Sequence, residues 1–174
     1  MNKKYLASVL MLLILFSNLF AEPGSSNFPR IGLTASLTNS HLDIMLPIFL
    51  LETISIAPAF SYASVEDVGT DISIGALLRI YRPKDKYAPF IGLGLASLSY
   101  KPEENNDFPT NSEQVNDFIL SPHLGIERYI DDRFCIGISA QYNMTTTDNS
   151  SFRFGYPGKK VTNTATSLYV TLFF

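Results

Sequence analysis

The chain has 174 residues, which is enough for one domain and too few for two full-sized ones. Its residues are 46% apolar, 13% aromatic and only 17% charged, whereas soluble proteins are about 25% charged, so the chain is not disordered. A net charge of −3 argues against nucleic-acid binding. The single cysteine, Cys135, excludes an intrachain disulfide and a cysteine-based zinc cluster. The mean hydropathy of +0.13 is too low for a bundle of membrane helices.

The first 21 residues have the pattern of a secretory signal peptide. Lys3 and Lys4 precede an apolar run over residues 6–16, and Ala21 is a small residue at the cleavage point. This run is shorter than the roughly 20 residues that a membrane-spanning helix needs. Residues 22–29 (EPGSSNFP) show no periodicity and are predicted to be a linker. The domain itself is therefore assigned to residues 30–174.

From residue 31 onward, apolar side chains recur at every second position, which predicts β-strands. Between residues 133 and 143, for example, Phe134, Ile136 and Ile138 share one face. Cys135 and Gly137 lie on the other. The same alternation predicts eight strands, at residues 31–37, 42–49, 54–62, 71–81, 91–96, 118–127, 133–143 and 167–174. Short connections near residues 51–52, 83–86 and 131–132 alternate with longer polar ones at 64–70, 102–114 and 146–160, as in an outer-membrane barrel.

The composition of the second face decides between a membrane barrel and a soluble one. A lipocalin-like barrel or a secreted sandwich also alternates, but its outer face carries long charged side chains. Here the less apolar face is rich in Gly, Ala and Ser, which suits the cramped lumen of an eight-stranded barrel. The apolar face then contacts lipid, with Tyr62, Tyr100 and Tyr142 in an interfacial girdle. The predicted fold is thus all-β, an eight-stranded antiparallel up-and-down transmembrane β-barrel.

Three prolines fall inside predicted strands. Proline cannot donate a hydrogen bond to the ladder, so it is disfavoured in a strand interior. We expect Pro47, Pro58 and Pro122 to lie at bulges or at strand ends.

The C-terminal sequence SLYVTLFF, residues 167–174, is similar to the end of bacterial outer-membrane barrels, where a terminal Phe follows apolar residues at alternate positions. Together with the signal peptide and the eight strands, it makes residues 30–174 resemble the small OmpA/OmpX-type outer-membrane β-barrel family. The resemblance implies that Val170, Leu172 and Phe174 form a signal for the barrel-assembly machinery. It implies nothing specific about an activity.

Polar residues on the lumen face form the first candidate site. They are Asp43, Arg79, His123, Glu127 and Gln141. A charge in a dry lumen must be paired, so we predict an Arg79–Glu127 pair with Tyr81 or Tyr129 as a hydrogen-bond partner. Such a network is either a structural plug or the gate of a narrow ion path.

Ser121, His123 and Glu127 share one strand face and raise the question of a hydrolase. Same-face neighbours on a strand are about 6.6 Å apart and Glu127 is about 13 Å from His123, from the rise per residue. A triad therefore requires an acid from another strand, such as Asp43.

The loops provide the second candidate site. Residues 146–160 combine Phe152, Phe154 and Tyr156 with Arg153, beside two lysines. Exposed aromatic groups next to cations suit contact with a partner surface or a glycan.

These features predict a monomeric, non-catalytic protein of the bacterial outer membrane with a structural or adhesion-like role and no cofactor. The expected partners are outer-membrane lipid and lipopolysaccharide, the barrel-assembly machinery and a host or surface ligand. Nucleic acid is not expected. The alternatives are a barrel-embedded lipid-modifying enzyme similar to lipid A deacylases, and a narrow gated pore.

Overall fold

A computed structural model describes residues 30–38, 41–65, 69–82, 86–102, 114–151 and 156–174. The predicted signal peptide and linker, residues 1–29, lie outside this range. The strands are β1 (Gly32–Thr38), β2 (His41–Met45), β3 (Ile48–Leu51), β4 (Ile54–Val65), β5 (Gly69–Tyr81), β6 (Tyr87–Pro102), β7 (Val115–Tyr129), β8 (Phe134–Thr146) and β9 (Lys160–Phe173). Among the described residues, no helix is long and apolar enough to cross a membrane.

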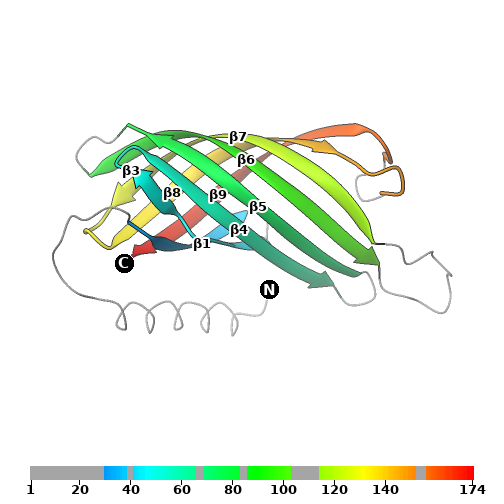
Figure 1. The fold of residues 1–174 in the computed structure, drawn as a ribbon, viewed down its shortest axis with the longest axis horizontal. Helices are drawn as coiled ribbons and strands as arrows, with labels where there is room; N and C mark the ends of the chain where they lie inside the picture. The colour runs from blue at the N-terminus through cyan, green and yellow to red at the C-terminus, as the bar shows by residue number, and fades with distance from the viewer. Residues whose placement is uncertain (1–29, 39–40, 66–68, 83–85, 103–113, 152–155) are drawn as a thin grey trace.

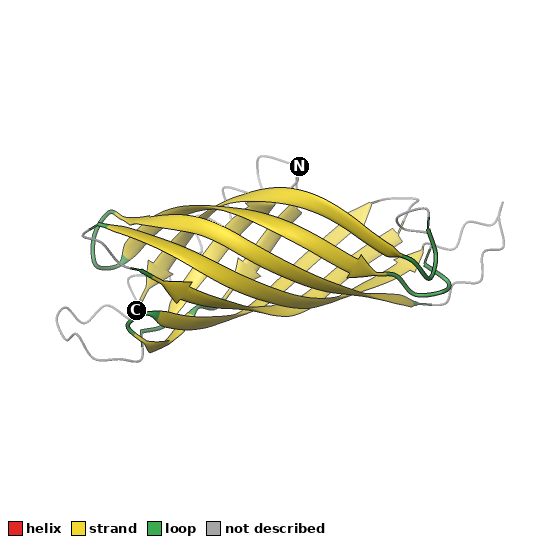
Figure 2. Ribbon diagram, turned by 90° about the horizontal axis from the view of Figure 1, so that it is seen from above, coloured by secondary structure: helices red, strands yellow, loops and turns green. Residues whose placement is uncertain are grey.

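The nine strands form a closed antiparallel barrel with eight positions in its wall. Consecutive strands pair from β4 to β9, β9 pairs with β1, and β1 pairs with β2. The ring closes because β2 also pairs with β4, and β3 continues β2 along the same neighbour. Figures 1 and 2 show the result as a cylinder of tilted strands. The predicted eight-stranded barrel is confirmed, with the second predicted strand divided into β2 and β3.

The two ends of the barrel differ. We call the end where β1, β4, β6 and β8 finish the loop end, because the two longest connections, after β6 and after β8, start there. The end where β3, β5 and β7 finish is the turn end. The C-terminus reaches the turn end, where the backbone N–H of Phe174 donates to the carbonyl of Ile31 at 2.9 Å. Two of the three predicted long connections are confirmed, between β6 and β7 and between β8 and β9. The third, predicted at 64–70, is wrong, because β4 extends to Val65 and β5 already begins at Gly69.

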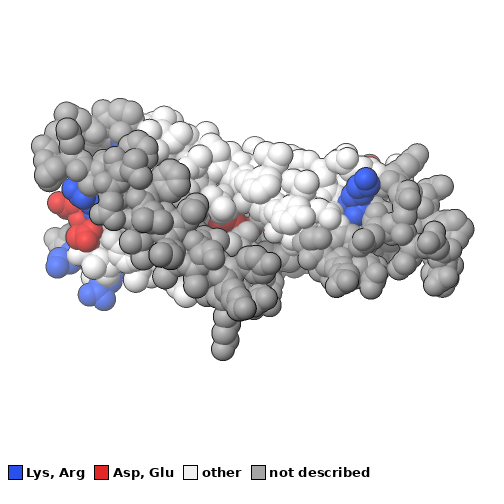
Figure 3. Space-filling model, turned by 90° about the horizontal axis from the view of Figure 1, so that it is seen from below, with Lys and Arg blue, Asp and Glu red and all other residues white. Residues whose placement is uncertain are grey.

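Burial follows the predicted alternation. On β7, for instance, Ser121 and Glu127 are buried while Leu124 is 65% exposed. The large apolar side chains that remain exposed lie on every strand and form an apolar outer face. Figure 3 shows that described Lys and Arg side chains gather at the two ends of the molecule, with a mostly uncharged surface between them. An apolar belt between charged rims matches the layers of a lipid bilayer.

One aromatic residue was assigned to the wrong face. Tyr62 and Tyr142 are exposed on the outer face as predicted. Tyr100, however, pairs with Asp71 and with the buried Val115 and therefore lies on the lumen face. The prediction failed because near the loop end β6 carries Ser97 and Ser99 outside, so hydropathy no longer distinguishes its faces.

The prediction that prolines occupy bulges or strand ends is right for Pro47, which lies in the break between β2 and β3, and wrong for Pro58 and Pro122. Pro58 pairs with Ala76 of β5 in an unshifted register, and its carbonyl accepts from the N–H of Leu46 at 2.9 Å. A residue in an antiparallel ladder directs its N and O to the same neighbour. The N–H that Pro58 lacks would therefore point toward the β2–β3 strand, which is itself broken at Pro47.

Pro122 follows the same rule. It pairs with β6 in an unshifted register, while the ladder from β7 to β8 is interrupted between the pairs Leu120–Met144 and His123–Gln141. The register is equal on both sides of the gap, so no residue is inserted. Proline in this barrel is tolerated by omitting a bond on one side, not by a bulge.

Glycines on the lumen face make room for aromatic rings on the paired strand. Gly125 pairs with Phe90, and Gly137 pairs with Tyr169. A Cβ added at Gly125 would lie 2.4 Å from the Phe90 ring, and one at Gly137 would lie 2.2 Å from the Tyr169 ring. Each ring thus lies over the paired strand. It occupies space that is empty only because the residue beneath it is glycine.

We predict that Gly137→Ala lowers the free energy of unfolding by about 1–3 kcal/mol, because its methyl group overpacks the lumen against Tyr169. Urea titration of protein refolded into lipid vesicles, followed by heat-modifiable mobility on gels, measures this change. Ala140→Val adds methyl groups on the outer face of the same strand and serves as the control. Equal stability of the Gly137→Ala variant and the wild type would contradict the packing described here.

Candidate functional site

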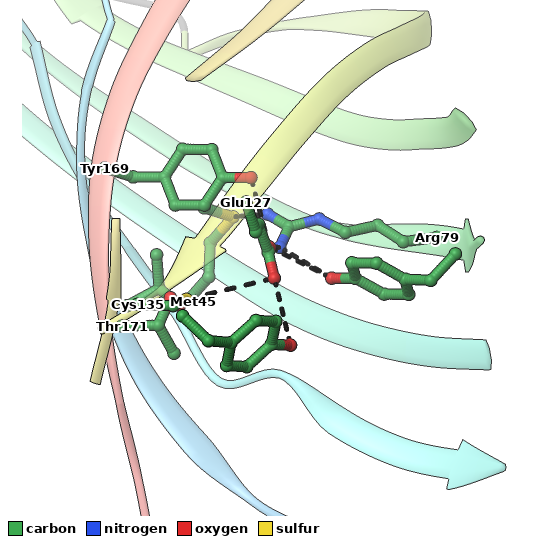
Figure 4. A network of polar contacts seen from close by, with 9 residues as sticks. Met45, Arg79, Glu127, Cys135, Tyr169 and Thr171 are labelled. Carbon is green, nitrogen blue, oxygen red and sulfur yellow. Dashed lines mark hydrogen bonds and ion pairs between the residues drawn. The ribbon is translucent and has the colours of Figure 1, made fainter. Parts of the chain in front are cut away.

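A buried ion pair inside the lumen joins the two strands on either side of β6. Arg79 of β5 and Glu127 of β7 face inward near the turn end, and their side chains are 2% and 1% exposed. The Nη1 atom of Arg79 donates to Oε1 of Glu127 at 2.9 Å (Figure 4). The predicted Arg79–Glu127 pair is therefore present.

Glu127 is also the acceptor for three tyrosines. The hydroxyls of Tyr81 and Tyr169 each donate to its Oε1 at 3.1 Å, and that of Tyr129 donates to Oε2 at 3.3 Å. The predicted partners Tyr81 and Tyr129 thus both contact the carboxylate, and Tyr169 adds a third contact that the sequence did not suggest. Several donors to one carboxylate offset the desolvation of its charge, which the ion pair alone would not do.

Aromatic rings enclose the guanidinium of Arg79. Its Cζ lies 5.0 Å from the ring centre of Phe90 and 5.1 Å from that of Tyr169. Its Nη1 also donates to the Tyr81 hydroxyl at 3.2 Å. Phe90 and Tyr169 are the two rings that lie over glycines, so the missing Cβ atoms on β7 and β8 shape the cation site.

Between this network and the turn end, stacked aromatic rings narrow the lumen. Phe49 stacks on Tyr81 with ring centres 5.3 Å apart, and Phe173 stacks on Tyr129 at 5.8 Å. The guanidinium of Arg30 lies 4.1 Å from the Phe173 ring centre and donates to the backbone carbonyl of Asp132. The network and these rings together are called the plug.

The plug separates two cavities. A cavity of about 340 Å³ occupies the lumen toward the loop end, and another of about 350 Å³ lies at the mouth of the turn end. We call the cavity toward the loop end the outer cavity. The remaining predicted lumen residues, Asp43, His123 and Gln141, line it. The five predicted lumen residues are therefore divided between the plug and the outer cavity, and they do not form one cluster.

The candidate hydrolase residues are not assembled. The Ser121 hydroxyl donates to Oδ1 of Asn143 at 2.7 Å, and the carboxylate of Glu127 is engaged in the plug. Nδ1 of His123 is buried and has no hydrogen-bond partner among the described residues. The geometry gives Ser121 no base. Nor do the described residues contain a group of three side chains that could hold a metal ion.

One functional feature escaped the sequence analysis. Asp117 of β7 is 2% exposed and faces the lumen near the loop end. Its carboxylate accepts from the backbone N–H of Asp148 and from the Ser151 hydroxyl, both at 2.9 Å. Asp117 is an even number of residues from Ser121 on the same strand, and this alternation could have placed it inside the barrel. Asp117 attaches the β8–β9 connection to the mouth of the lumen.

Of the predicted loop residues, Phe152, Arg153 and Phe154 lie outside the described residues. Tyr156 is described and 65% exposed. In the predicted assembly signal, Val170 and Leu172 lie on the outer face of β9, opposite the buried Tyr169, and the exposed Phe174 directly follows the strand. The side chains of this predicted signal are thus on the outer side of the barrel.

These features define the class: an eight-stranded β-barrel of the outer-membrane type with a plugged lumen. No protein-family model matches the sequence, and no curated protein matches it. Among solved structures, the chain is similar to the N-terminal β-barrel domain of Pseudomonas aeruginosa OprF, with 13% identity, a TM-score of 0.54 and coverage of 83% of this chain and 96% of the other. It is also similar to Neisserial surface protein A, with 11% identity, a TM-score of 0.55 and coverage of 83% and 95%. The predicted likeness to small outer-membrane barrels is confirmed as a likeness of fold.

We predict that Arg79→Met lowers the free energy of unfolding by about 3–5 kcal/mol, because it leaves the Glu127 carboxylate buried without its cation. The double variant Arg79→Met/Glu127→Leu removes both charges and regains most of the loss. Urea unfolding in vesicles measures both, with Arg128→Met, an exposed arginine on β7, as the control. If the double variant is no more stable than Arg79→Met, the charge imbalance is not the cause.

Proposed function

We propose that this protein is a non-catalytic barrel of the bacterial outer membrane that binds a partner at the cell surface through the connections at its loop end. The apolar outer face, the closed ring of strands and the likeness to outer-membrane barrels support the location. The protein is then a monomer whose apolar belt contacts lipid and lipopolysaccharide. The barrel-assembly machinery recognises its last strand. Because the plug fills the lumen near the turn end, a role in the free diffusion of solutes through the barrel is not favoured.

The anchored β8–β9 connection is the observation that carries the surface role. Besides the contacts of Asp117, the Thr147 hydroxyl donates toward the carbonyls of Tyr156 and Lys159, each at 2.9 Å. The backbone N–H of Lys159 in turn donates to that hydroxyl at 2.9 Å. A connection held in this way loses less conformational entropy when a partner binds.

The exposed Tyr156 gives this connection a binding group. An aromatic ring with a polar tip contributes large contact area at low entropic cost. Next to it in sequence, Phe152, Arg153 and Phe154 supply further aromatic and cationic groups. This chemistry fits a host or surface ligand such as a glycan, whose C–H faces pack on rings and whose hydroxyls accept from cations.

We expect the purified barrel in nanodiscs to bind at least one member of an array of immobilised surface glycans and matrix proteins. Tyr156→Ala should weaken that binding about tenfold, because a central aromatic contact contributes more than 1 kcal/mol. Biolayer interferometry measures the affinity. Tyr87→Ala removes an exposed tyrosine near the turn end and is the matched control. The proposal fails if nothing on the array is retained, or if Tyr87→Ala weakens binding as much as Tyr156→Ala.

A second candidate function is a narrow pore with the plug as its gate. It is favoured by one observation: the two cavities on the lumen axis are separated by Arg79, Glu127 and the rings around them. The alternative of a lipid-modifying enzyme has no comparable support, since Ser121 is bonded to Asn143 and not to a base.

If the plug is a gate, Arg79→Ala raises the single-channel conductance in planar bilayers severalfold above the near-background level of the wild type, because it removes both a bulky side chain and one charge of the pair. Arg128→Ala, on the outer face of β7, should leave the conductance unchanged. Background conductance in both the wild type and Arg79→Ala would exclude the gate.

A further inference from the structure

The wall of the barrel is lower at the hairpin of β1 and β2 than at the strands beside it. Thr38 is the last residue of β1 and pairs with Ser167, whereas β9 begins at Lys160. Residues 160–166 therefore extend past β1, and among the described strands they pair with β8 alone. On the other side of the hairpin, β4 also continues past its last pair with β2. The wall thus has a notch at the loop end, and one side of this notch is an open edge of β9.

The direction of the backbone groups along this edge follows from the register. In an antiparallel ladder a residue directs its N–H and C=O to the same neighbour, so alternate residues of β9 face β8 and β1. The N–H of Phe173 donates to the carbonyl of Arg133, next to β8, at 2.7 Å. The N–H of Phe174 donates to the carbonyl of Ile31, next to β1, at 2.9 Å, so even-numbered residues face the β1 side. Beyond β1, the residues whose N–H and C=O point into the notch, with no partner among the described residues, are Lys160, Thr162 and Thr164.

The open edge lies outside the apolar belt. The outward side chains of β9 change from Leu168 to Thr166, Thr164 and Thr162 toward the loop end, and all three threonines are exposed. In hydrocarbon each unpaired backbone group would cost several kcal/mol, so an open edge is permitted only where water reaches it. The edge is therefore available to a partner that arrives from the aqueous side.

This edge has few of the features that prevent pairing with another chain. Natural edge strands are protected by proline, by bulges or by charges. Residues 161–166 (VTNTAT) contain no proline and no charge, and their register with β8 is unshifted. Val161 and the threonines are β-branched, which favours extended pairing. Lys160, at the open end, is the one charged residue of the edge.

The spacing of the open groups selects the chemistry of the partner. N–H and C=O groups that alternate along an extended edge are complemented by another extended backbone. We propose that an extended polypeptide segment of another protein pairs with residues 160–166 of β9, antiparallel to them. Such a segment continues β1 along β9, as β3 continues β2 along β4. It uses the backbone of β9 and none of the side chains of the β8–β9 connection, so it is independent of the surface role proposed above.

The side chains around the notch define the sequence that fits. Outward positions of the segment lie beside Thr162 and Thr164, and β-branched residues pair well there. The position opposite Lys160 suits an acidic residue, because opposite charges across a strand pair are favourable. Inward positions face the outer cavity, which Asn163 lines. Small polar side chains fit these positions, and proline does not fit any position that must donate to β9.

A second copy of the barrel in the same membrane does not fit this edge. A twofold axis along the membrane normal gives both β9 strands the same direction across the bilayer, so the two edges would meet parallel. Because strands of such barrels are tilted by about 35–45°, the two edges would also cross at roughly 70–90°, and no ladder could form. The geometry thus favours a segment from a different protein.

The test is fluorescence polarisation with the full barrel in zwitterionic micelles. The probe is the peptide TSVSVSE, acetylated at its N-terminus and labelled beyond its C-terminus. Its threonine, valines and glutamate take the outward positions when it lies antiparallel to β9, and we expect saturable binding. N-methyl groups on both valines remove donors aimed at β9 and should weaken binding at least tenfold. N-methyl groups on the second and third serines, whose N–H groups point away from β9, are the matched control and should leave the affinity unchanged.

Variants of the barrel locate the site. Thr164→Pro removes an N–H that faces the notch but no bond of the β8–β9 ladder, so the barrel should fold and bind the peptide at least tenfold more weakly. Thr164→Val keeps this N–H and the shape of the side chain, and it should retain binding. Heat-modifiable gel mobility verifies folding. If Thr164→Pro does not fold, the two methylated peptides test the same bonds on the wild type.

Several results would overturn the proposal. They are no saturable change in polarisation, equal affinity of the two methylated peptides, and binding by a folded Thr164→Pro variant that is as strong as that of the wild type. A dimer of the barrel that the peptide dissociates would also overturn it, because a second copy would then occupy the edge.

Discussion

Closure of the backbone hydrogen-bond ring is the constraint on which the rest of this structure depends. Within a bilayer, an unpaired backbone N–H or C=O costs several kcal/mol, so an open sheet edge is not allowed. The last strand therefore pairs with the first, β9 with β1, and the β2–β4 pairing completes the ring. Proline is tolerated in this ring where its missing N–H omits a bond on one side only, as at Pro58 opposite the break near Pro47.

A closed ring of only eight wall positions has a narrow lumen, and that narrowness determines its chemistry. Two of the lumen rings occupy the space that glycine leaves on the paired strand, Phe90 over Gly125 and Tyr169 over Gly137. Those rings enclose Arg79, which pairs with Glu127. The glycine positions of the narrow ring thus make room for the plug. The plug separates a cavity toward the loop end from a cavity at the mouth of the turn end.

This division separates the roles that we propose. The plug contributes stability and blocks the axis of the barrel. The outer half keeps an acidic cavity, and the connection anchored by Asp117 lies at its mouth. Partner binding at the loops and the ion pair of the plug use different residues, so a variant that removes one leaves the other measurable.

The sequence by itself predicted the class of fold, because a period of two indicates strands. A second face of small residues with few charges then assigns the apolar face to lipid. It also predicted the Arg79–Glu127 pair, since two charges on the lumen face of a narrow barrel need each other. It placed strand ends poorly: the strand expected at 91–96 is Tyr87–Pro102, and the one expected at 167–174 begins at Lys160. Beyond the apolar belt the outer face is polar as well, as at Ser97 and Thr164. The alternation of apolar and polar residues therefore stops before the strand ends.

Only the tertiary structure decided which residues meet across strands. Register brings Tyr169 onto Gly137 and toward Glu127, sets Asp43 and Asp71 two strands apart, and leaves Ser121 bonded to Asn143 instead of a base. Alternation tells which face a side chain occupies, but not which neighbour it has. The neighbour depends on the stagger between strands, which is fixed only when the whole ring closes.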